Sequence, residues 1–390
     1  MADSSTPDLM HHANLLTEMV QINSVNPLQV GERSGPGGEA EMAQWVAARA
    51  DAAGASEVVL DPVEPGRPNV YARFDGAGEG HVAIDVHLDT VGIEHMTGDP
   101  LDGRIADGRL YGRGAVDTKA TLAVVLPILA GRANKLLPGP TVHLLGTVGE
   151  EAGGLIGAYR FLEWAQARSL QFDQIIVAEP TLCSPVHGHK GGVGLEVTVK
   201  GEAAHSSKPE LGANAIVGAA RVVEAFEQEQ NRLAAQPVDN PVGAGTLSVT
   251  EISGGLARNI IPDQCHLYAG RRVAPGEDPE AIFADLSSIA RRAAEPFELD
   301  IEMSNDVCSP AFYEEPDSEL ITTLCELSGE KPGVASYGSN ALVYRPIAKQ
   351  IAVFGPGSID QAHKAVEWVE LSELERAVSA YRLWLGLPSD

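Results

Sequence analysis

Acidic and imidazole side chains that could bind metal ions recur along this chain, and most of them stand where a strand ends or a loop begins. The set comprises His87, Asp89, Asp117, Glu150, Glu151, Glu179 and His363. Carboxylates with histidines and no thiolate suit zinc or another first-row divalent ion at an open, catalytic site. Five of these seven side chains as ligands would fit two ions that share one bridging carboxylate. Such ions lie roughly 3.5 to 4 Å apart and activate water for attack on a carbonyl. The set therefore indicates metal-assisted hydrolysis.

The run HVAIDVHLDTVG, residues 81–92, is predicted to be a strand that carries two of these residues. Side chains alternate between the two faces of a strand, which separates Val82, Ile84, Val86 and Leu88 from Ala83, Asp85, His87 and Asp89. The imidazole and its neighbouring carboxylate then lie at the carboxyl end of the strand, where ligands gather in open α/β sheets. An amphipathic edge strand with a solvated polar face would explain the run equally well.

The other acidic candidates also have structural alternatives. Asp117 stands where the Gly-rich loop LDGRIADGRLYGRGAVDTKA enters a helical pattern, so it could cap that helix or point into a cleft. Glu150 and Glu151 follow a buried-strand pattern, and because adjacent side chains diverge, one could bind a metal while the other faces a substrate. A solvated acidic loop is the alternative for this pair. Glu179 follows a second buried-strand pattern.

The elements that must position these residues are typical of a doubly wound α/β sheet. Apolar periodicity predicts helices over 8–25, 38–53, 115–131, 155–168 and 372–385, and strands over 69–74, 81–92, 141–148, 173–178 and 350–354. The ends of parallel strands converge on one edge of a sheet. We therefore expect a mostly parallel metal-binding domain formed by residues 1–185 and 307–390.

A different pattern runs from 186 to 306. The segment VGLEVTVK, residues 193–200, alternates as an antiparallel strand with one solvated face does. A helix over 213–232, strands over 246–252 and 265–271, a helix over 279–294 and a strand over 297–303 follow. This β-α-β-β-α-β order predicts an inserted ferredoxin-like domain, a split βαβ unit of about 120 residues, that serves as a lid or a dimerisation domain.

Length and composition narrow the class of protein. With 390 residues, 44% of them apolar, the chain can form roughly two to three domains. Its 54 acidic and 28 basic residues give a formal charge of −26, which repels nucleic acid and anionic lipid and leaves small neutral or cationic partners open. Without a signal-peptide pattern or a membrane-length apolar run, we expect a cytoplasmic protein. The four cysteines lack a CxxC pair, which predicts reduced thiols.

Six blocks follow one another along the chain: HLDTV, GRGAVDTKA, GEE, AEP, GEAAHSSKP and GPGSIDQAH. In this order they resemble the signature blocks of the M20 family of dinuclear zinc amidohydrolases and peptidases, and the resemblance covers nearly the whole chain. It implies two Zn²⁺ ions per subunit, with Co²⁺ as a possible substitute, and a homodimer formed through the inserted domain.

Carried over residue by residue, the resemblance assigns the metal ligands. His87 and Glu179 would complete one metal site, and Glu151 and His363 would complete the other. Asp117 would bridge the two ions.

The resemblance also implies three catalytic residues. Glu150 would be the general base that takes a proton from the water bridging the two ions and passes it to the leaving amine. Asp89 would hold the His87 imidazole in its tautomer. His205, in the block GEAAHSSKP of the inserted domain, would stabilise the tetrahedral oxyanion, in cis or in the partner subunit's site of a dimer. A loop histidine beside a turn is the structural alternative for His205.

Further positions resemble contacts to a substrate carboxylate. Arg258 and Asn259, in ARNIIP, form one such pair, and an Arg fork is the usual partner of a carboxylate. The backbone of Gly355 and Gly357 forms another. Arg272 occupies the arginine of a family DxRxxPG block in which Gly270 replaces the acid.

Within the family, the segments EPTLCSPVHGHKG, AAHSSKPELGANAI and FGPGSIDQAHKAVEWVEL most resemble the acetylornithine deacetylase group. The resemblance implies hydrolysis of the amide of an N-acyl amino acid, with N-acetylornithine of arginine biosynthesis as the expected substrate. Succinyl-diaminopimelate desuccinylase, aminoacylase, and carboxypeptidase or dipeptidase activities are the enzymatic alternatives. A non-catalytic binding protein on a peptidase scaffold is the alternative of another class, but such a protein would lack the base or a ligand, and the sequence contains them all.

Overall fold

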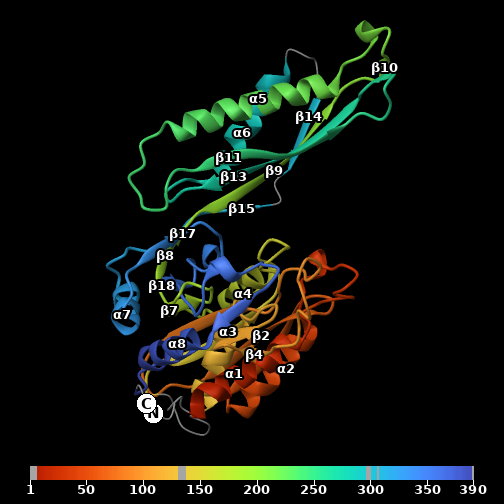
Figure 1. The fold of residues 1–390 in the computed structure, drawn as a ribbon. Helices are drawn as coiled ribbons and strands as arrows, with labels where there is room; N and C mark the ends of the chain where they lie inside the picture. Colours follow the sequence, from red (N-terminus) through yellow and green to blue (C-terminus); the bar gives the residue numbers. More distant parts are fainter. Residues whose placement is uncertain (1–6, 131–137, 296–299, 305–306, 389–390) are drawn as a thin grey trace. The chain divides into compact units, whose positions relative to one another are not determined.

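A computed structural model describes residues 7–130, 138–295, 300–304 and 307–388, which form two compact units (Figure 1). Unit 1 comprises Met1–His187, Glu314–Gly333 and Ser339–Asp390, and unit 2 comprises Gly188–Tyr313 and Val334–Gly338. The insertion extends beyond residue 306, where we expected it to end, because the short strand β15 (Cys308–Ser309) still pairs with a strand of unit 2.

The nine-stranded sheet, most of which belongs to unit 1, has a parallel centre and antiparallel edges. Its strand order is β1 (Glu57–Glu64), β2 (Arg67–Phe74), β6 (Thr141–Thr147), β3 (His81–His87), β7 (Phe172–Val177), β18 (Ala348–Val353), β8 (Val186–His189) and β16 (Phe312–Tyr313), with β17 (Gly333–Ala335) paired to β8. The four strands from β6 to β18 are parallel. The predicted α/β architecture is confirmed, and because β3 lies between β6 and β7, the edge-strand alternative for it is wrong.

Helices cover both faces of this sheet and explain the alternation of β3. Val82, Ile84 and Val86 belong to one apolar cluster. Residues of α1 (Pro7–Val20), α2 (Ala40–Ala52), α3 (Lys119–Ala130), α7 (Glu319–Ser328) and α8 (Leu371–Trp384) complete that cluster. Each such aliphatic side chain contributes about 1.5–3 kcal/mol when fully buried. On the opposite face, Phe161 and Trp164 of α4 (Ile156–Ala167) pack against Tyr71. The side chains that could do chemistry share this second face of β3.

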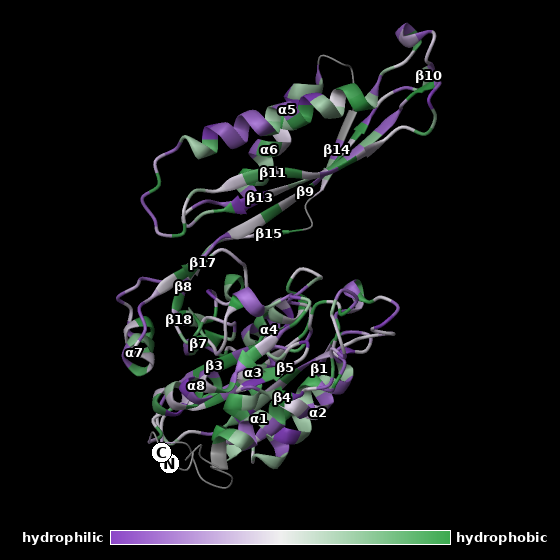
Figure 2. Cartoon of the chain, in the orientation of Figure 1, coloured by the Kyte–Doolittle hydropathy of each residue, from purple (hydrophilic) through white to green (hydrophobic). Residues whose placement is uncertain are grey.

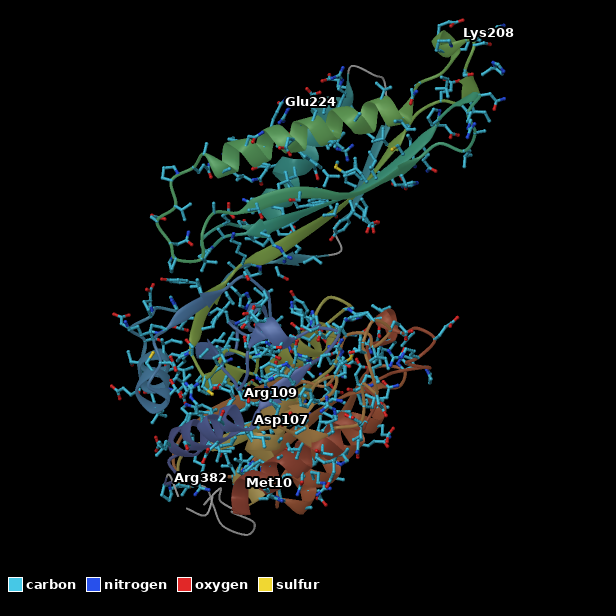
Figure 3. The ribbon with its side chains drawn as sticks, viewed as in Figure 1. Met10, Asp107, Arg109, Lys208, Glu224 and Arg382 are labelled. Atoms are coloured by element: carbon cyan, nitrogen blue, oxygen red, sulfur yellow. The ribbon has the colours of Figure 1, made fainter. Side chains whose placement is uncertain are left out.

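A small three-stranded sheet joins the C-terminal part of unit 1 to the loop that precedes α3. Its order is β19 (Trp368–Glu370), β5 (Arg109–Tyr111) and β4 (Ile105–Ala106). Trp368 lies opposite Tyr111, and Arg109, labelled in Figure 3, forms an ion pair with Glu370 at 2.9 Å. This pairing connects the segment after His363 with the segment that leads to Asp117.

Unit 2 is a five-stranded antiparallel sheet covered by two helices, and the predicted split βαβ order is confirmed. The strand order is β11 (Thr246–Gly254), β13 (Gln264–Val273), β9 (Gly191–Lys200) and β14 (Asp300–Ser304), with β15 beside β9. Part of the strand predicted over 297–303 lies outside the described residues. The helices α5 (Ala215–Ala234) and α6 (Pro279–Ala294) share a core with alternate residues of the strands. Figure 2 shows hydrophobic and hydrophilic residues interspersed along α5, whose apolar side includes Val222 and Phe226.

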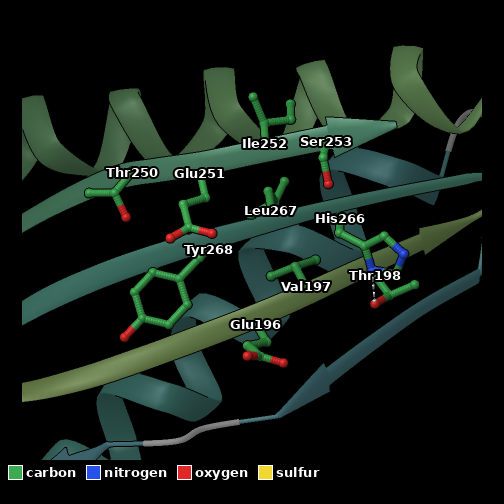
Figure 4. Close-up of a pocket in the computed structure, with 10 residues that line it drawn as sticks. All are labelled: Glu196, Val197, Thr198, Thr250, Glu251, Ile252, Ser253, His266, Leu267 and Tyr268. Atoms are coloured by element: carbon green, nitrogen blue, oxygen red, sulfur yellow. Dashed lines mark hydrogen bonds between the residues drawn. The ribbon is translucent and has the colours of Figure 1, made fainter. Parts of the chain in front are cut away.

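The other face of the unit 2 sheet is polar and hollowed. A cavity of about 840 Å³ is lined by residues of β9, β11 and β13, among them Glu196, Glu251 and Tyr268 (Figure 4). His266 in this cavity hydrogen-bonds to Thr198 at 2.9 Å. A two-stranded arm, β10 (Ala204–His205) with β12 (Ile260–Ile261), extends from the unit. Among the described segments, no helix combines the length and apolar character needed to cross a membrane.

Candidate metal centre

Three ligand-type side chains from three different segments converge at the carboxyl edge of the unit 1 sheet. His87 ends β3, Glu179 follows β7, and Asp117 stands two residues before α3. One ligand atom of each lies within 4.8 Å of the others. All three residues are buried. The topology brings them together because the strands that carry His87 and Glu179 are parallel neighbours.

A second group shares Asp117 with the first. Glu151 and His363 each offer an atom within 4.8 Å of Asp117 and of one another. Asp117 Oδ1 lies 3.1 Å from His87 Nε2, while Asp117 Oδ2 lies 3.2 Å from His363 Nε2. The two oxygens of one carboxylate therefore face two different imidazoles, which is the geometry of a bridging ligand.

The ligand atoms have the spacing that a small divalent cation requires. Around zinc, bonds of about 2.0–2.2 Å at tetrahedral angles separate neighbouring ligand atoms by about 3.3 Å. His363 Nε2 lies 3.1 Å from Glu151 Oε2, close to that value. Together with Glu150, the carboxylates of both groups carry a formal charge of −4, which two divalent ions would neutralise. The side chains present thus fit a pair of such ions.

Burial, neighbouring charges and hydrogen bonds raise the pKa values of some residues of the site and lower that of Asp117. Burial raises the pKa of Glu151 to about 7, and the negative charge of Asp117 adds to this effect. Burial also raises the pKa of Glu179. Burial opposes a charged Asp117, but its hydrogen bonds with His363 and His87 outweigh burial and hold its pKa below the ordinary value. The same contacts, with Asp117 first and Glu151 second, raise the pKa of His363 to about 10. Strongly shifted groups in one cluster are typical of functional sites.

Glu150 lies beside both ligand groups but belongs to neither. Burial raises its pKa well above the ordinary range, His87 opposes the shift, and Glu151 and Asp89 add to it. Gly149, just before it, has φ +74°, and a Cβ at that position would come within 2.7 Å of Ile156. The turn therefore needs glycine, and it directs the two adjacent glutamates differently. A buried carboxyl with a raised pKa beside metal ligands is suited to proton transfer.

Asp89 contacts His87 through its backbone and the turn of Glu150 and Glu151 through its side chain. The nearest acceptor to His87 Nδ1 is the backbone oxygen of Asp89 at 2.9 Å, whereas the carboxylate oxygen is 3.8 Å away. Because a carbonyl only accepts, Nδ1 donates to it, and Nε2, which faces Asp117, is the ring nitrogen that would bind a metal. The Asp89 carboxylate instead accepts from the backbone N–H groups of Glu150 at 3.1 Å and Glu151 at 3.0 Å. The Asp89 carboxylate thus holds the turn that carries both glutamates, and its predicted action on the His87 imidazole stays a prediction.

His363 has an unusual backbone conformation for its residue type. Its φ is +59°, in the left-handed region that costs a non-glycine residue roughly 1 kcal/mol. Its carbonyl accepts from His95 Nε2 at 3.2 Å, and its ring meets Asp117 and Glu151. Such conformations persist where the surroundings over-determine them, often at functional sites.

The glycines predicted to contact substrate contribute differently. Gly355 donates its N–H to Thr181 Oγ1 at 3.1 Å, and its carbonyl accepts from Cys183 N at 2.9 Å. A Cβ at Gly355 would come within 2.7 Å of the carbonyl of Glu179. Both polar backbone groups of Gly355 are therefore engaged with the loop that follows Glu179. Gly355 thus positions the loop after Glu179, and the predicted substrate contacts of Gly355 and Gly357 stay predictions.

The remaining predicted residues, His205, Arg258, Asn259 and Arg272, belong to unit 2 and are exposed. His205 Nδ1 lies 2.7 Å from Ser207 Oγ on the two-stranded arm. Arg272 is near the end of β13, beside the hollow over Gly270, where an added Cβ would meet no atom within 4 Å. Their predicted roles in oxyanion and carboxylate binding stay predictions.

Three residues near the centre carry contacts that sequence reasoning missed. Asn26 donates to the Asp89 carboxylate at 2.7 Å, and Lys119 donates to two carbonyls at the end of α1. Glu367 accepts from the backbone of Asp117 at 3.3 Å. The available signals were the position of Lys119 in the block GRGAVDTKA and that of Glu367 four residues after His363.

Comparison with curated proteins finds relatives over most of the chain. An acetylornithine deacetylase of Myxococcus xanthus is 33% identical over 342 residues, which cover 85% of this chain and 88% of that protein. An acetylornithine deacetylase of Aliivibrio salmonicida is 30% identical over 330 residues, covering 83% and 85%. Residues 187–298 match the family model described as a peptidase dimerisation domain.

Solved structures share the fold at low sequence identity. An M20 family metallo-carboxypeptidase from Sulfolobus solfataricus superposes with a TM-score of 0.75 at 17% identity, covering 96% of this chain and 98% of that one. A dinuclear metal-binding peptidase of the M20 family from Bacillus subtilis gives 0.70 at 16% identity, covering 97% of each.

Proposed function

This chain belongs to the M20 family of metallopeptidases and deacetylases, and from that premise we propose that it removes the acyl group from an N-acylated amino acid, with N-acetylornithine as the first candidate substrate. The bridging geometry of Asp117, with one carboxylate oxygen toward His87 and the other toward His363, is the observation that supports metal-dependent hydrolysis most strongly. The acetylornithine deacetylases of Myxococcus xanthus and Aliivibrio salmonicida, at 33% and 30% identity, support the choice of substrate.

We assign zinc to both ligand groups because imidazole nitrogens and carboxylate oxygens without thiolate suit this ion. His87, Asp117 and Glu179 would hold one ion, and Glu151 and His363 would hold the other together with Asp117. Bound there, the two ions would polarise the substrate carbonyl and lower the pKa of a water molecule.

Glu150 would move the proton. Its buried carboxylate would accept a proton from the attacking water and then give it to the nitrogen of the leaving amine, so that the C–N bond breaks and an acid and an amine form. A raised pKa suits the second half of this task, because the carboxyl must hold the proton until the amine leaves. Asp89 and Gly149 would keep the turn in the shape that presents this carboxylate.

Unit 2 would supply contacts to the substrate. His205 would donate a hydrogen bond to the oxyanion of the tetrahedral intermediate, and Arg258, Asn259 and Arg272 would bind the α-carboxylate. The match of residues 187–298 to a dimerisation domain supports a homodimer formed through unit 2. Light scattering should give the mass of two chains, and a mass of one chain at all concentrations would contradict this assembly.

A substrate panel tests the proposal. The purified protein, loaded with Zn²⁺ or Co²⁺, is assayed against N-acetylornithine, N-succinyl-diaminopimelate, other N-acyl amino acids and dipeptides. We expect the highest kcat/KM with N-acetylornithine. Turnover of another member alone would retire the acetylornithine assignment and keep the hydrolase. A protein that binds two metal ions per chain and cleaves nothing in the panel would favour a binding protein instead.

A further inference from the structure

A buried ion pair between Arg113 and Glu367 lies beside the candidate metal centre and has no part in the proposed reaction. The two side chains are 1% and 0% exposed, and Arg113 Nη1 binds Glu367 Oε2. Arg113 Nη2 donates to the carbonyl of Gly92 at 3.1 Å, while Arg113 Nε is without a hydrogen-bond partner in the described part of the chain. Burying two charges costs several kcal/mol per ion, so such a pair is poor evidence for added stability. Its location points to a different use.

The second oxygen of Glu367 contacts the backbone from which Asp117 projects. Oε1 accepts from the N–H of Val116 at 3.0 Å and from the N–H of Asp117 at 3.3 Å. Arg113 fixes the direction of the carboxylate through the other oxygen. The backbone at Asp117 is therefore held by a side chain that comes from a segment 250 residues away in the sequence.

Glu367 also belongs to the segment that carries His363. Carbonyls along this segment accept hydrogen bonds at every second residue: His363 O from His95 at 3.2 Å, Ala365 O from Thr97 at 2.9 Å and Glu367 O from Gly112 at 3.0 Å. One residue thus joins the two stretches of chain that present Asp117 and His363.

We propose that Glu367, oriented by Arg113, is a positioning residue for the ligand set Asp117, Glu151 and His363. Glu367 connects the segments of Asp117 and His363, and both of these residues belong to this set. In the other set, His87, Asp117 and Glu179, it contacts Asp117. Loss of its grip therefore weakens metal binding at Glu151 and His363 more than at His87 and Glu179. This inference rests on the proposed function, because it takes these side chains as metal ligands.

Two double variants separate the effect of the hydrogen bonds from Val116 and Asp117 to Glu367 from the effect of the buried charges. R113M/E367Q removes both charges but keeps an amide oxygen that can accept from Val116 and Asp117. R113M/E367L removes both charges and the acceptor. The matched control R109M/E370L deletes a partly exposed ion pair from β5 and β19, the strands next to this site, without contact to Asp117.

The readout is metal uptake, measured by equilibrium dialysis with metal analysis and by the visible absorption of bound Co²⁺ during titration. We expect the unmodified protein, the control and R113M/E367Q to bind two ions per chain with similar affinities. R113M/E367L should bind its second ion about 10- to 100-fold more weakly, the usual cost of losing a residue that orients a ligand.

The outcomes distinguish a failure of the proposed function from a failure of the role given to Glu367. Fewer than two ions in the unmodified protein would contradict the proposed function itself. Two ions there, with unchanged affinities in R113M/E367L or with an equal loss in both double variants, would overturn the role of Glu367 alone. If circular dichroism finds R113M/E367L unfolded, E367D replaces it, because it keeps the charge for Arg113 but withdraws the acceptor by about 1.5 Å. An unchanged second site in E367D would also overturn the inference.

Discussion

Unit 1 buries many charged side chains, whereas the described charged side chains of unit 2 are, apart from Arg271, at least partly exposed. The buried acids and bases of unit 1 include Glu39, Arg67, Asp85, Asp89, Arg113, Asp117, Lys119, Glu179 and Glu367. Among the described Asp, Glu, Lys and Arg residues of unit 2, Arg271 is buried. The difference is one of architecture: the central strands of unit 1 are covered on both faces, while the unit 2 sheet is covered by helices on one face.

The contrast shows where a preorganised site can form. Burying a charge is costly unless its partners are fixed, and unit 1 fixes them with backbone contacts such as those of Asp89 and Glu367. Such fixed dipoles and charges are what stabilise a transition state. Residues such as His205 and Arg258, which lie exposed on unit 2, are suited to a supporting contribution. Substitutions should therefore have larger effects in unit 1 than in unit 2.

The largest effect is expected at Glu150. E150Q keeps the size of the side chain but cannot accept the proton, so kcat should fall by about 10⁴-fold, the upper end for a general base. Metal content should stay at the unmodified level because Glu150 is outside both ligand sets. Stopped assays with metal analysis of the same sample check both points. Full activity with normal metal content would remove Glu150 from its role.

A smaller loss is expected from unit 2. H205A should reduce kcat by about 10²- to 10³-fold, as the removal of one oxyanion donor does, with metal content unchanged. Mixing E150Q with H205A then tests whether His205 acts across a dimer. In trans, about a quarter of the unmodified activity should return after subunit exchange. No recovery from a mixture shown to contain heterodimers would assign His205 to its own chain.

In unit 1 the sequence was most informative where residues with metal-binding side chains lie within a clear strand pattern. The period of two in β3 predicted the apolar face of Val82 and Ile84 and the end position of His87, and the structure agrees. Local sequence patterns were less informative where the position of a strand in the sheet decides which residues it accepts. The strand β1 was not predicted because Pro62 argues against a strand, and proline is accepted here because β1 is an edge strand.

Long-range partners lay beyond prediction from a single sequence. The first helix, expected to reach residue 25, ends at Val20, because Val25 forms a bridge with Thr90 and Asn26 turns toward Asp89. No periodicity encodes a contact between Asn26 and a residue 63 positions away. The metal ligands could be predicted from the chemistry of their side chains. The residues that orient these ligands, such as Asn26, are brought to them only when the chain folds.

A substitution of Asp89 tests the contribution of the residues that orient the ligands, and we expect a moderate effect. In D89N the amide can accept from only one of the two N–H groups of Glu150 and Glu151, so the turn should loosen and kcat should fall about 10- to 100-fold. Metal bound at His87 should remain, because the backbone carbonyl of Asp89 orients that ring. Metal analysis and kcat are measured on one preparation. Loss of one metal ion with retained turn geometry would instead support the predicted action of the Asp89 carboxylate on His87.

The smallest effect concerns stability rather than turnover, and it compares a buried histidine of unit 1 with an exposed one of unit 2. Burial lowers the pKa of His143 in the folded protein to about 3, from an ordinary value of 6.5. The unfolded chain therefore binds a proton below pH 6.5 that the folded chain does not, so the free energy of unfolding falls as pH falls from 6.5 toward 3. By pH 5 the loss should be about 2 kcal/mol. Urea titrations of metal-free protein should show this slope reduced in H143Q and unchanged in H266Q, whose histidine is exposed. Parallel curves for the unmodified protein and H143Q would mean that burial does not lower the pKa of His143 in the folded protein.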